Sequence, residues 1–235
     1  MKELYLCSFS SSDLKRSIER YLFQAKEMNI YNKIKVYTEG DLPKNIKNQI
    51  EDFFSLKQKR LYGYACWKAY IIKNFIESVP KNSIVQYSDI GCHFNVNGKK
   101  RLLEYIEICK KKNILGFQYY KPNNNFNQDF IYQNYIEKNF TKKKLFKYLN
   151  VENDESILNS AQFWSGTVFF QNNEFTINFL SEWEKLSSIN YLIDDSLFDE
   201  RNDTRFVEHR HDQSIFSLLC KINNIEGLSA SECEW

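Results

Sequence analysis

The spacing of hydrophobic and polar residues along this chain switches repeatedly between a strand-like and a helix-like period. Short apolar, β-prone runs predict strands at residues 3–9, 34–38, 83–87, 114–119 and 162–170. Apolar residues three and four positions apart predict helices at about 13–28, 46–75, 99–112, 142–149, 173–186 and 212–222, the second interrupted near 61–64. Because strands alternate with helices, we expect a single α/β domain with a mostly parallel, Rossmann-like sheet flanked by helices.

Helix caps and breakers support several of these boundaries. The polar cluster at residues 10–13 can cap the first helix, Thr141 can cap the helix at 142–149, and Pro80 separates a helix from the third strand. A loop is predicted at residues 122–125. The sequence contains no Gly-rich phosphate loop of the dinucleotide or P-loop kind. In such a fold, ligands are expected at the carboxyl ends of the strands.

Composition excludes several classes of partner. The chain has 235 residues, and its 32 basic and 30 acidic side chains leave a formal charge of +2, so no overall field favours nucleic acid. The first apolar run is too short for a signal-peptide core or a transmembrane segment, which predicts a cytoplasmic protein. The lysines at 110–112 and 142–144 are expected on solvated helix faces, the alternative being peripheral contact with the inner face of an anionic membrane. The scattered cysteines are expected to be reduced.

Asp89 directly follows the predicted third strand, in the segment Tyr87-Ser88-Asp89-Ile90-Gly91. A carboxylate at the carboxyl end of a strand can hold a divalent cation that bridges two phosphates, or accept a hydrogen bond from a ribose hydroxyl. The alternative is a structural role, with Asp89 capping a loop or turn.

Two further segments combine aromatic residues with groups that contact ligands. The turn at residues 60–70 includes Trp67 and Lys68, which can stack on a base or sugar and neutralise a phosphate. The alternative is an aromatic core cluster with a snorkelling lysine. At Trp164-Ser165-Gly166, glycine permits close approach of a ligand and the indole can stack on a sugar, or the tryptophan simply packs beside a bulge.

The segment from residue 206 to residue 214 concentrates polar side chains just before a predicted helix. Such a group is unfavourable to bury without a purpose. His211 can ligate a metal or shuttle a proton, Arg210 can pair with a diphosphate, and Asp212 can cap the helix. The alternative is a solvated loop in which Asp212 is a simple cap.

Taken in order, these segments resemble a family of bacterial glycosyltransferases with a GT-A-like fold, found in capsule and surface-polysaccharide clusters. The resemblance covers most of the chain. It is carried by Ser8-Phe9-Ser10, Arg16 and Ala25, Gly63-Tyr64 with Trp67-Lys68, Tyr87 to Gly91, Glu137-Lys138 with Thr141-Lys142, Trp164-Ser165-Gly166, and His209 to Ser214.

The resemblance implies transfer of a sugar from a UDP- or GDP-linked donor to a capsule, surface or lipid-linked glycan. It implies one domain over residues 1–235, with a nucleotide-sugar half at about 1–120 and an acceptor half at about 121–235. The residues implied for donor binding are Ser8, Phe9, Ser10, Arg16, Tyr64, Trp67, Lys68, Ser88, Asp89, Arg210 and Gln213. Those implied for acceptor binding are Trp164, Ser165 and Gly166, and those for catalysis are Asp89, His211 and Asp212.

One position departs from the family's pattern. The Asp-x-Asp metal motif of GT-A enzymes requires an acid where this chain has Gly91. Either Asp89 holds Mg²⁺ or Mn²⁺ with help from His211 or Asp212, or cations such as Lys68 and Arg210 stabilise the leaving diphosphate. The same site also suits a non-catalytic nucleotide-sugar or glycan-binding protein, or a phospho- or nucleotidyl-transferase.

Overall fold

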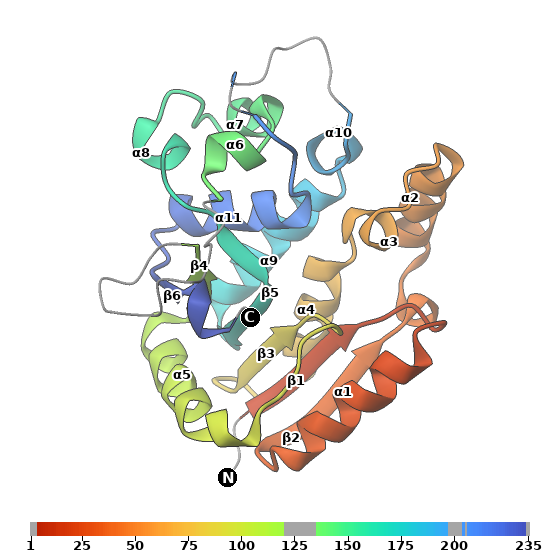
Figure 1. The fold of residues 1–235 in the computed structure, drawn as a ribbon, viewed down its shortest axis with the longest axis vertical. Coiled ribbons are helices and arrows are strands. Elements are labelled where there is room, and N and C mark those ends of the chain that lie inside the picture. Colours follow the sequence, from red (N-terminus) through yellow and green to blue (C-terminus); the bar gives the residue numbers. More distant parts are fainter. Residues whose placement is uncertain (1–3, 120–134, 197–203, 205, 234–235) are drawn as a thin grey trace, which may run out of the picture.

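The computed structural model describes residues 4–119, 135–196, 204 and 206–233, and its strands form one six-stranded sheet of order β2-β1-β3-β5-β4-β6 (Figure 1). The strands are β1 (Leu4–Phe9), β2 (Tyr31–Tyr37), β3 (Ile84–Ser88), β4 (Ile114–Gln118), β5 (Phe163–Gln171) and β6 (Gly227–Ser229). All neighbouring strands pair in parallel except β5, which runs against both β3 and β4. The expected α/β domain with a mostly parallel sheet is confirmed.

Helices flank both faces of this sheet. The longer ones are α1 (Lys15–Glu27), α2 (Lys44–Ser55), α4 (Lys68–Glu77), α5 (Lys99–Lys112), α9 (Glu174–Ser187) and α11 (Asp212–Ile222). The shorter ones are α3 (Leu61–Tyr64), α6 (Glu137–Phe140), α7 (Lys143–Tyr148), α8 (Glu155–Leu158) and α10 (Asn190–Ile193), with 3₁₀ turns η1 (Glu39–Asp41), η2 (Val96–Gly98) and η3 (Ala230–Glu232). None of the helices in the described residues is both long and apolar enough to cross a membrane.

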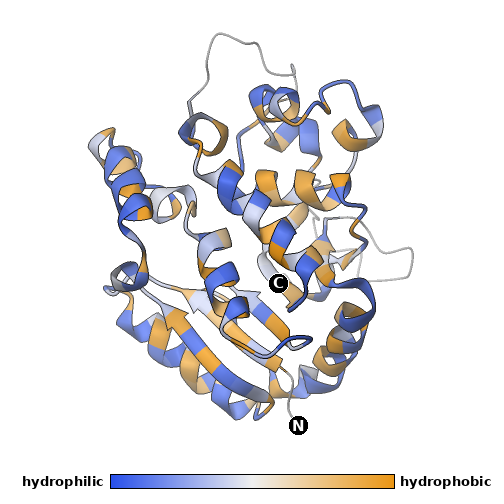
Figure 2. Ribbon diagram, turned by 180° about the vertical axis from the view of Figure 1, so that it is seen from behind, coloured by the Kyte–Doolittle hydropathy of each residue, from blue (hydrophilic) through white to orange (hydrophobic). Residues whose placement is uncertain are grey.

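Side chains that point to opposite faces of the sheet pack into two separate hydrophobic cores. In β3, Ile84 packs into the core shared with α1 and α5, whereas Val85 and Tyr87 pack into the core shared with α4, α9 and α11. In β5, Phe169 belongs to the first of these cores and Phe170 to the second. The long helices are amphipathic, and Figure 2 shows both hydrophobic and hydrophilic positions on each.

Several boundaries differ from those predicted. Strand β2 begins at Tyr31 rather than residue 34, and β6 and the short helices α6, α8 and α10 were not anticipated. Thr141 does not cap α7, because its hydroxyl donates to the Glu137 carboxylate at 2.8 Å. The predicted loop at 122–125 lies outside the described residues.

The predicted interruption near 61–64 is a left-handed turn between α2 and α4. Five consecutive residues have positive φ, namely Leu61 (49°), Tyr62 (52°), Gly63 (79°), Tyr64 (57°) and Ala65 (57°). The amides of Tyr64 and Ala65 donate to the carbonyls of Arg60 and Leu61 at 2.8 and 3.2 Å, so the turn is hydrogen-bonded. Left-handed helical backbone costs roughly 1–2 kcal/mol per non-glycine residue, so the surrounding packing must hold it in place.

Replacing Gly63 should test this packing. A Cβ at Gly63 would lie 2.7 Å from Ile50 Cγ1, at a φ of +79°. We therefore expect Gly63→Ala to lower the free energy of unfolding by about 1–3 kcal/mol in urea denaturation. Gly98→Ala is the matched control, because a Cβ there meets nothing within 4 Å. Equal stabilities of the two variants would contradict a tightly packed turn.

Candidate functional site

Segments distant in the chain meet where β1 and β3 end. Strand β5 reaches this edge because it runs antiparallel: Thr167 pairs with Ser88, so Trp164 and Ser165 extend past the end of β3. The Asp89 amide donates to the Gly166 carbonyl at 2.8 Å, which joins the loop after β3 to β5. The single reversed strand thus places the two predicted segments side by side.

Lys68 lies at the centre of this edge and is almost fully buried. Its ammonium group is 2.8 Å from Asp212 Oδ2 and 3.3 Å from Asp89 Oδ1. It also donates to Ser165 Oγ at 3.2 Å, and that hydroxyl donates to Asp212 Oδ2 at 2.8 Å. One lysine therefore connects α4, the loop after β3, strand β5 and helix α11.

The two carboxylates differ in what they offer a ligand. The Asp212 side chain is 3% exposed, whereas the Asp89 side chain is 44% exposed. Tyr87 donates to Asp89 Oδ1 at 2.5 Å, which orients the carboxylate at the end of the strand. Asp212 is therefore a buried partner of Lys68, and Asp89 presents a carboxylate to solvent.

Burial and neighbouring charges shift the pKa values of Lys68 and Asp89 in opposite directions. Burial alone would lower the pKa of Lys68, but Asp212 and Asp89 outweigh it and raise the pKa, so the ammonium stays charged. For Asp89, whose side chain is only partly exposed, burial of the rest of the carboxyl group raises the pKa above its ordinary value, against the opposing effects of Lys68 and Tyr87. An aspartate with a raised pKa is a stronger base than an ordinary one.

The N-terminus of α11 favours the charge of Asp212, whereas the N-terminus of α4 disfavours the charge of Lys68. Asp212 occupies the first turn of α11, where a negative charge is favoured by the helix dipole. Lys68 is the first residue of α4, where a positive charge is disfavoured, so its carboxylate partners must hold it there. Asp212 does not cap α11 as expected: the N-cap is His211, with φ 55°.

A cavity of about 610 Å³ opens on this edge. One part of its wall is aromatic, formed by Phe9, Tyr62 and Trp67, and the Phe9 and Trp67 rings stack with centroids 3.9 Å apart. Another part carries positive charge from Lys59, Arg60 and Arg210, while Asp13, Lys68 and Asp89 also line the cavity. We call it the first cavity. Its size and mixed apolar and charged lining suit a nucleotide-sized ligand.

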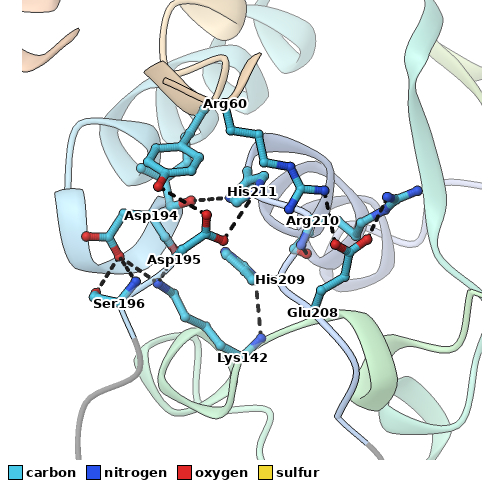
Figure 3. Close-up of polar contacts among 12 residues, drawn as sticks. Arg60, Lys142, Asp194, Asp195, Ser196, Glu208, His209, Arg210 and His211 are labelled. Carbon is cyan, nitrogen blue, oxygen red and sulfur yellow. Dashed lines mark hydrogen bonds and ion pairs between the residues drawn. The ribbon is translucent and has the colours of Figure 1, made fainter. Parts of the chain in front are cut away.

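Glu208 links two of the arginines at the rim of the first cavity (Figure 3). It accepts from Arg60 at 3.0 Å through Oε2 and from Arg210 at 2.8 Å through Oε1. The two arginines lower the pKa of Glu208 against the opposing effect of burial. The Arg210 guanidinium also lies 4.5 Å from the centre of the Tyr135 ring. Two oriented guanidinium groups therefore stand side by side around one carboxylate.

The two histidines of this segment are buried and tethered to α10 (Figure 3). His209 Nε2 contacts the Leu192 carbonyl at 2.9 Å, and His211 Nδ1 contacts the Ile193 carbonyl at 2.8 Å. Because a carbonyl only accepts, each of these nitrogens carries the proton. Burial lowers the pKa of both rings, so they are neutral. His211 Nε2 has no hydrogen-bond partner in the described residues and lies 3.7 Å from Asp195 Oδ1.

The side chains around Asp89 do not form a ligand set for Mg²⁺ or Mn²⁺. The Lys68 ammonium occupies the position between Asp89 and Asp212 where a cation would be shared. The Nδ1 atom of His211 contacts the Ile193 carbonyl of α10, and its Nε2 atom lies nearest Asp195, so neither nitrogen points to Asp89. Throughout the described ranges, no three His, Cys, Asp or Glu side chains gather in a way that could hold a metal ion.

The structure brings together most, but not all, of the predicted site residues. Those lining the first cavity are Phe9, Ser10, Trp67, Lys68, Asp89, Trp164, Ser165, Arg210, His211, Asp212 and Gln213. Ser8, Arg16, Tyr64, Ser88 and Gly166 do not appear in its lining, and Ser88, predicted to bind the donor, lines a second cavity instead. Ser8 donates to the Ser88 carbonyl at 2.6 Å, Tyr64 donates to Asp195 at 3.1 Å, and the space beside Gly166 is filled by the Trp164 indole.

Glu137, Thr141 and Lys142 lie away from this cavity and are buried. The Glu137 carboxylate accepts from Thr141, Gln162, Ser217 and Lys221. Lys142 pairs with Asp194 at 3.0 Å. The Glu137 contacts join α6 to the start of β5 and to α11, and the Lys142 pair joins the start of α7 to the end of α10, so this part of the resemblance concerns the fold.

Arg60 and Tyr62 belong to the turn at 60–70 predicted to contact a ligand, but no site role was assigned to either, and Lys59 and Asp13 were not predicted as site residues. A lysine and an arginine directly before an aromatic turn were a usable signal for Lys59 and Arg60. A second cavity, of about 710 Å³, was also missed. Asp89 and Trp164 line both cavities and therefore lie between them. Residues of both 1–120 and 121–235 contribute to each.

Comparisons with known proteins gave distant structural likenesses. No protein-family model and no curated protein matches the chain. Among solved structures, a glycosyltransferase involved in glycosylation of the major capsid of PBCV-1 has 11% identity and a TM-score of 0.40, covering 78% of this chain and 67% of that one. Mouse xyloside xylosyltransferase 1 in its apo form has 10% identity and a TM-score of 0.43, covering 96% and 84%.

A third likeness, 4-diphosphocytidyl-2C-methyl-D-erythritol synthase from Anaerococcus prevotii DSM 20548, has 7% identity and a TM-score of 0.37, covering 94% of this chain and 99% of that one. Likenesses at these TM-scores define neither the reaction nor the substrates of this chain. The functional conclusion therefore depends on the site residues.

A double-mutant cycle should measure the coupling at the centre of the site. Lys68→Met leaves the Asp212 carboxylate buried without its cation, which should lower the free energy of unfolding by roughly 3–5 kcal/mol. Asp212→Asn should also lower the free energy of unfolding. The loss in the double variant should be smaller than the sum of the two single losses by about 1–3 kcal/mol. Chemical denaturation gives each value. Additive losses would contradict an energetic link between Lys68 and Asp212.

Proposed function

We propose that this protein is a glycosyltransferase that moves a sugar from a nucleoside-diphosphate donor to a glycan acceptor. The observation that carries the proposal is the position of Asp89, an accessible carboxylate between two cavities, one of which combines aromatic rings with several cations. Sugar transfer requires two binding sites that meet at one point, because the donor and the acceptor must come together at one reacting carbon. The resemblance of the ordered motifs to capsule glycosyltransferases supports the same conclusion.

The first cavity is the proposed donor site. The half-buried Tyr62 ring offers a stacking surface for a base, backed by the stacked Phe9 and Trp67 rings, and the Asp13 carboxylate offers an acceptor for ribose hydroxyls. Arg60 and Arg210 can pair with the diphosphate, since guanidinium groups bind phosphate oxygens in bidentate fashion. Their shared partner Glu208 keeps both oriented before the donor arrives.

Lys68 has a different proposed role from phosphate binding. Its ammonium already contacts Asp89, Asp212 and Ser165. In the proposed mechanism it holds Asp89 in place and is a positioning residue. The charge that develops on the leaving diphosphate is stabilised by Arg60 and Arg210, and no step requires a metal ion.

Asp89 is the proposed general base. The acceptor hydroxyl oxygen bonds to the anomeric carbon of the sugar while the bond from that carbon to the diphosphate oxygen breaks. The hydroxyl proton passes to the Asp89 carboxylate, and the bonding electron pair leaves with the diphosphate. Asp212 is too enclosed to serve as this base, because its side chain is 3% exposed. A direct displacement of this kind inverts the anomeric configuration.

The setting proposed from the resemblance is the bacterial cytoplasm, at the inner face of the membrane. There the acceptor would be a capsule or surface glycan, free or linked to a lipid, and the donor would be UDP- or GDP-linked.

A donor panel should test the proposed activity. The protein is incubated with UDP-, GDP- and CDP-sugars, with and without Mn²⁺, and the nucleotide products are separated. We expect slow release of nucleoside diphosphate from one donor. Release of a nucleoside monophosphate would instead identify a phospho- or nucleotidyl-transferase, and binding without turnover would identify a binding protein.

Asp89→Asn should abolish transfer while the fold is retained. Loss of the base should reduce the rate by about 10²–10⁴-fold, and Lys68 keeps Asp212 as its ion partner. Asp52→Asn, on the exposed face of α2, is the control and should retain full activity. Transfer is measured with the donor found above, and circular dichroism checks the fold. Full activity in Asp89→Asn would refute the assignment.

The pH profile should report the same carboxylate. A general base must be ionised, so activity falls as the pH drops through the pKa of Asp89. Because that pKa is raised above 3.8, the acid limb of kcat/KM should lie at higher pH than for an ordinary aspartate. A profile with its acid limb at or below the ordinary aspartate value would contradict the proposed base.

A further inference from the structure

The second cavity lies on the α5 side of the sheet edge. Asp89 and Trp164 separate it from the first cavity, and its walls come from β3, β5, α5 and the loop that follows Asp89. The 3₁₀ turn η3 closes one side through Glu232. A ligand in this cavity would therefore reach Asp89 from the side opposite to the proposed nucleotide.

The sheet presents a fixed hydrogen-bond donor to this cavity. Gln86 is buried in the middle of β3, directly opposite Phe169 of β5, and both residues line the cavity. Tyr31 donates to Gln86 Oε1 at 2.8 Å, which sets the orientation of the amide. The Gln86 amide nitrogen has no hydrogen-bond partner among residues in the described part of the chain. This nitrogen is not among the fully buried atoms that lack a partner, so it is accessible from the cavity and can donate to a ligand oxygen.

Aromatic rings and amides line the rest of the cavity. Phe94, Tyr105 and Trp164 contribute rings, and Asn95 and Asn97 lie on the loop before α5. Asn95 accepts the Asn97 amide at 3.0 Å, which shapes the turn that displays the Asn97 side chain. Rings that cover apolar faces, together with a few oriented polar groups, suit a ligand that is flat on one side and rich in hydroxyls.

The charges in this cavity are already compensated. Arg101 donates to both carboxylate oxygens of Glu232, at 2.7 and 3.0 Å, and to Glu104 at 2.5 Å. Tyr105 also donates to Glu232 at 2.8 Å. Arg101 thus has two carboxylate partners, whereas Arg60 and Arg210 of the first cavity share one, so the second cavity favours an uncharged ligand over a phosphorylated one.

We infer that the second cavity binds the acceptor and that the acceptor's terminal residue is a neutral sugar. The inference rests on the proposed function, because it takes Asp89 as the point where both substrates meet. The rings of Trp164 and Tyr105 cover the apolar face of the sugar. Gln86 and Asn97 bind its hydroxyls, and the attacking hydroxyl points toward Asp89.

Two variants separate acceptor binding from donor chemistry. Gln86→Leu removes the amide at nearly constant volume, and Asn97→Ala removes an exposed amide without disturbing the core. Each should raise the KM for a neutral saccharide acceptor, tested as lactose, cellobiose and chitobiose, by about tenfold, as expected for one lost ligand hydrogen bond, with donor hydrolysis unchanged. Asn48→Ala, exposed on α2, is the matched control and should leave both values unchanged. A fall in donor hydrolysis in the two cavity variants would assign the cavity to the donor and overturn the inference.

Direct binding gives a second readout that does not depend on turnover. Saturation-transfer NMR is recorded with lactose, cellobiose and chitobiose, and with glucose 6-phosphate and glucuronic acid as charged probes. We expect signals from neutral saccharides that weaken in Asn97→Ala and persist in Asn48→Ala. Stronger binding of the charged probes, or neutral signals unaffected by Asn97→Ala, would overturn the inference. Donor hydrolysis in the same protein sample reports on the proposed function separately.

Discussion

The structure of the candidate site depends on one buried cation. Lys68 is held between Asp212 and Asp89 at the edge of the sheet, where the loss of water would make an isolated charge very unfavourable. The pairing determines where α4 and α11 begin relative to one another, and it holds the loop after β3 against β5 through Ser165. Removing any one partner would leave a buried charge incompletely paired, so the segments that carry Asp89, Ser165 and Asp212 are held to this one point.

The antiparallel strand β5 turns this arrangement into a two-sided site. Its start reaches the edge where β1 and β3 end, and it places Trp164 beside Asp89. Cations and aromatic rings lie on one side, and neutral amides and rings on the other. A carboxylate shared by two such cavities is suited to transfer between a charged donor and an uncharged acceptor. Two strained segments, the left-handed turn at 61–65 and His211, border the first cavity, as is common at functional sites.

Local patterns in the sequence predict much of the fold, because apolar periodicity reports burial directly. Asp89, Lys68 and Asp212 were also identifiable, since charged residues at the ends of apolar runs are unusual. The direction of β5 was not predictable from its apolar run, because a buried strand has the same pattern in either direction. The partners of Lys68 were not predictable either, because residues 68, 89, 165 and 212 meet only through the sheet order. Gln86 was visible as a polar residue in an apolar strand, but the direction of its amide is set by the hydrogen bond from Tyr31, which the sequence does not reveal.

A crystal structure of the protein soaked with UDP or GDP would show directly whether the first cavity is the donor site. We expect the diphosphate to contact Arg60 and Arg210 in the first cavity, with its terminal phosphate directed toward Asp89 and the Lys68 ion pairs intact. A nucleotide bound in the second cavity, or a diphosphate that contacts neither arginine, would contradict it.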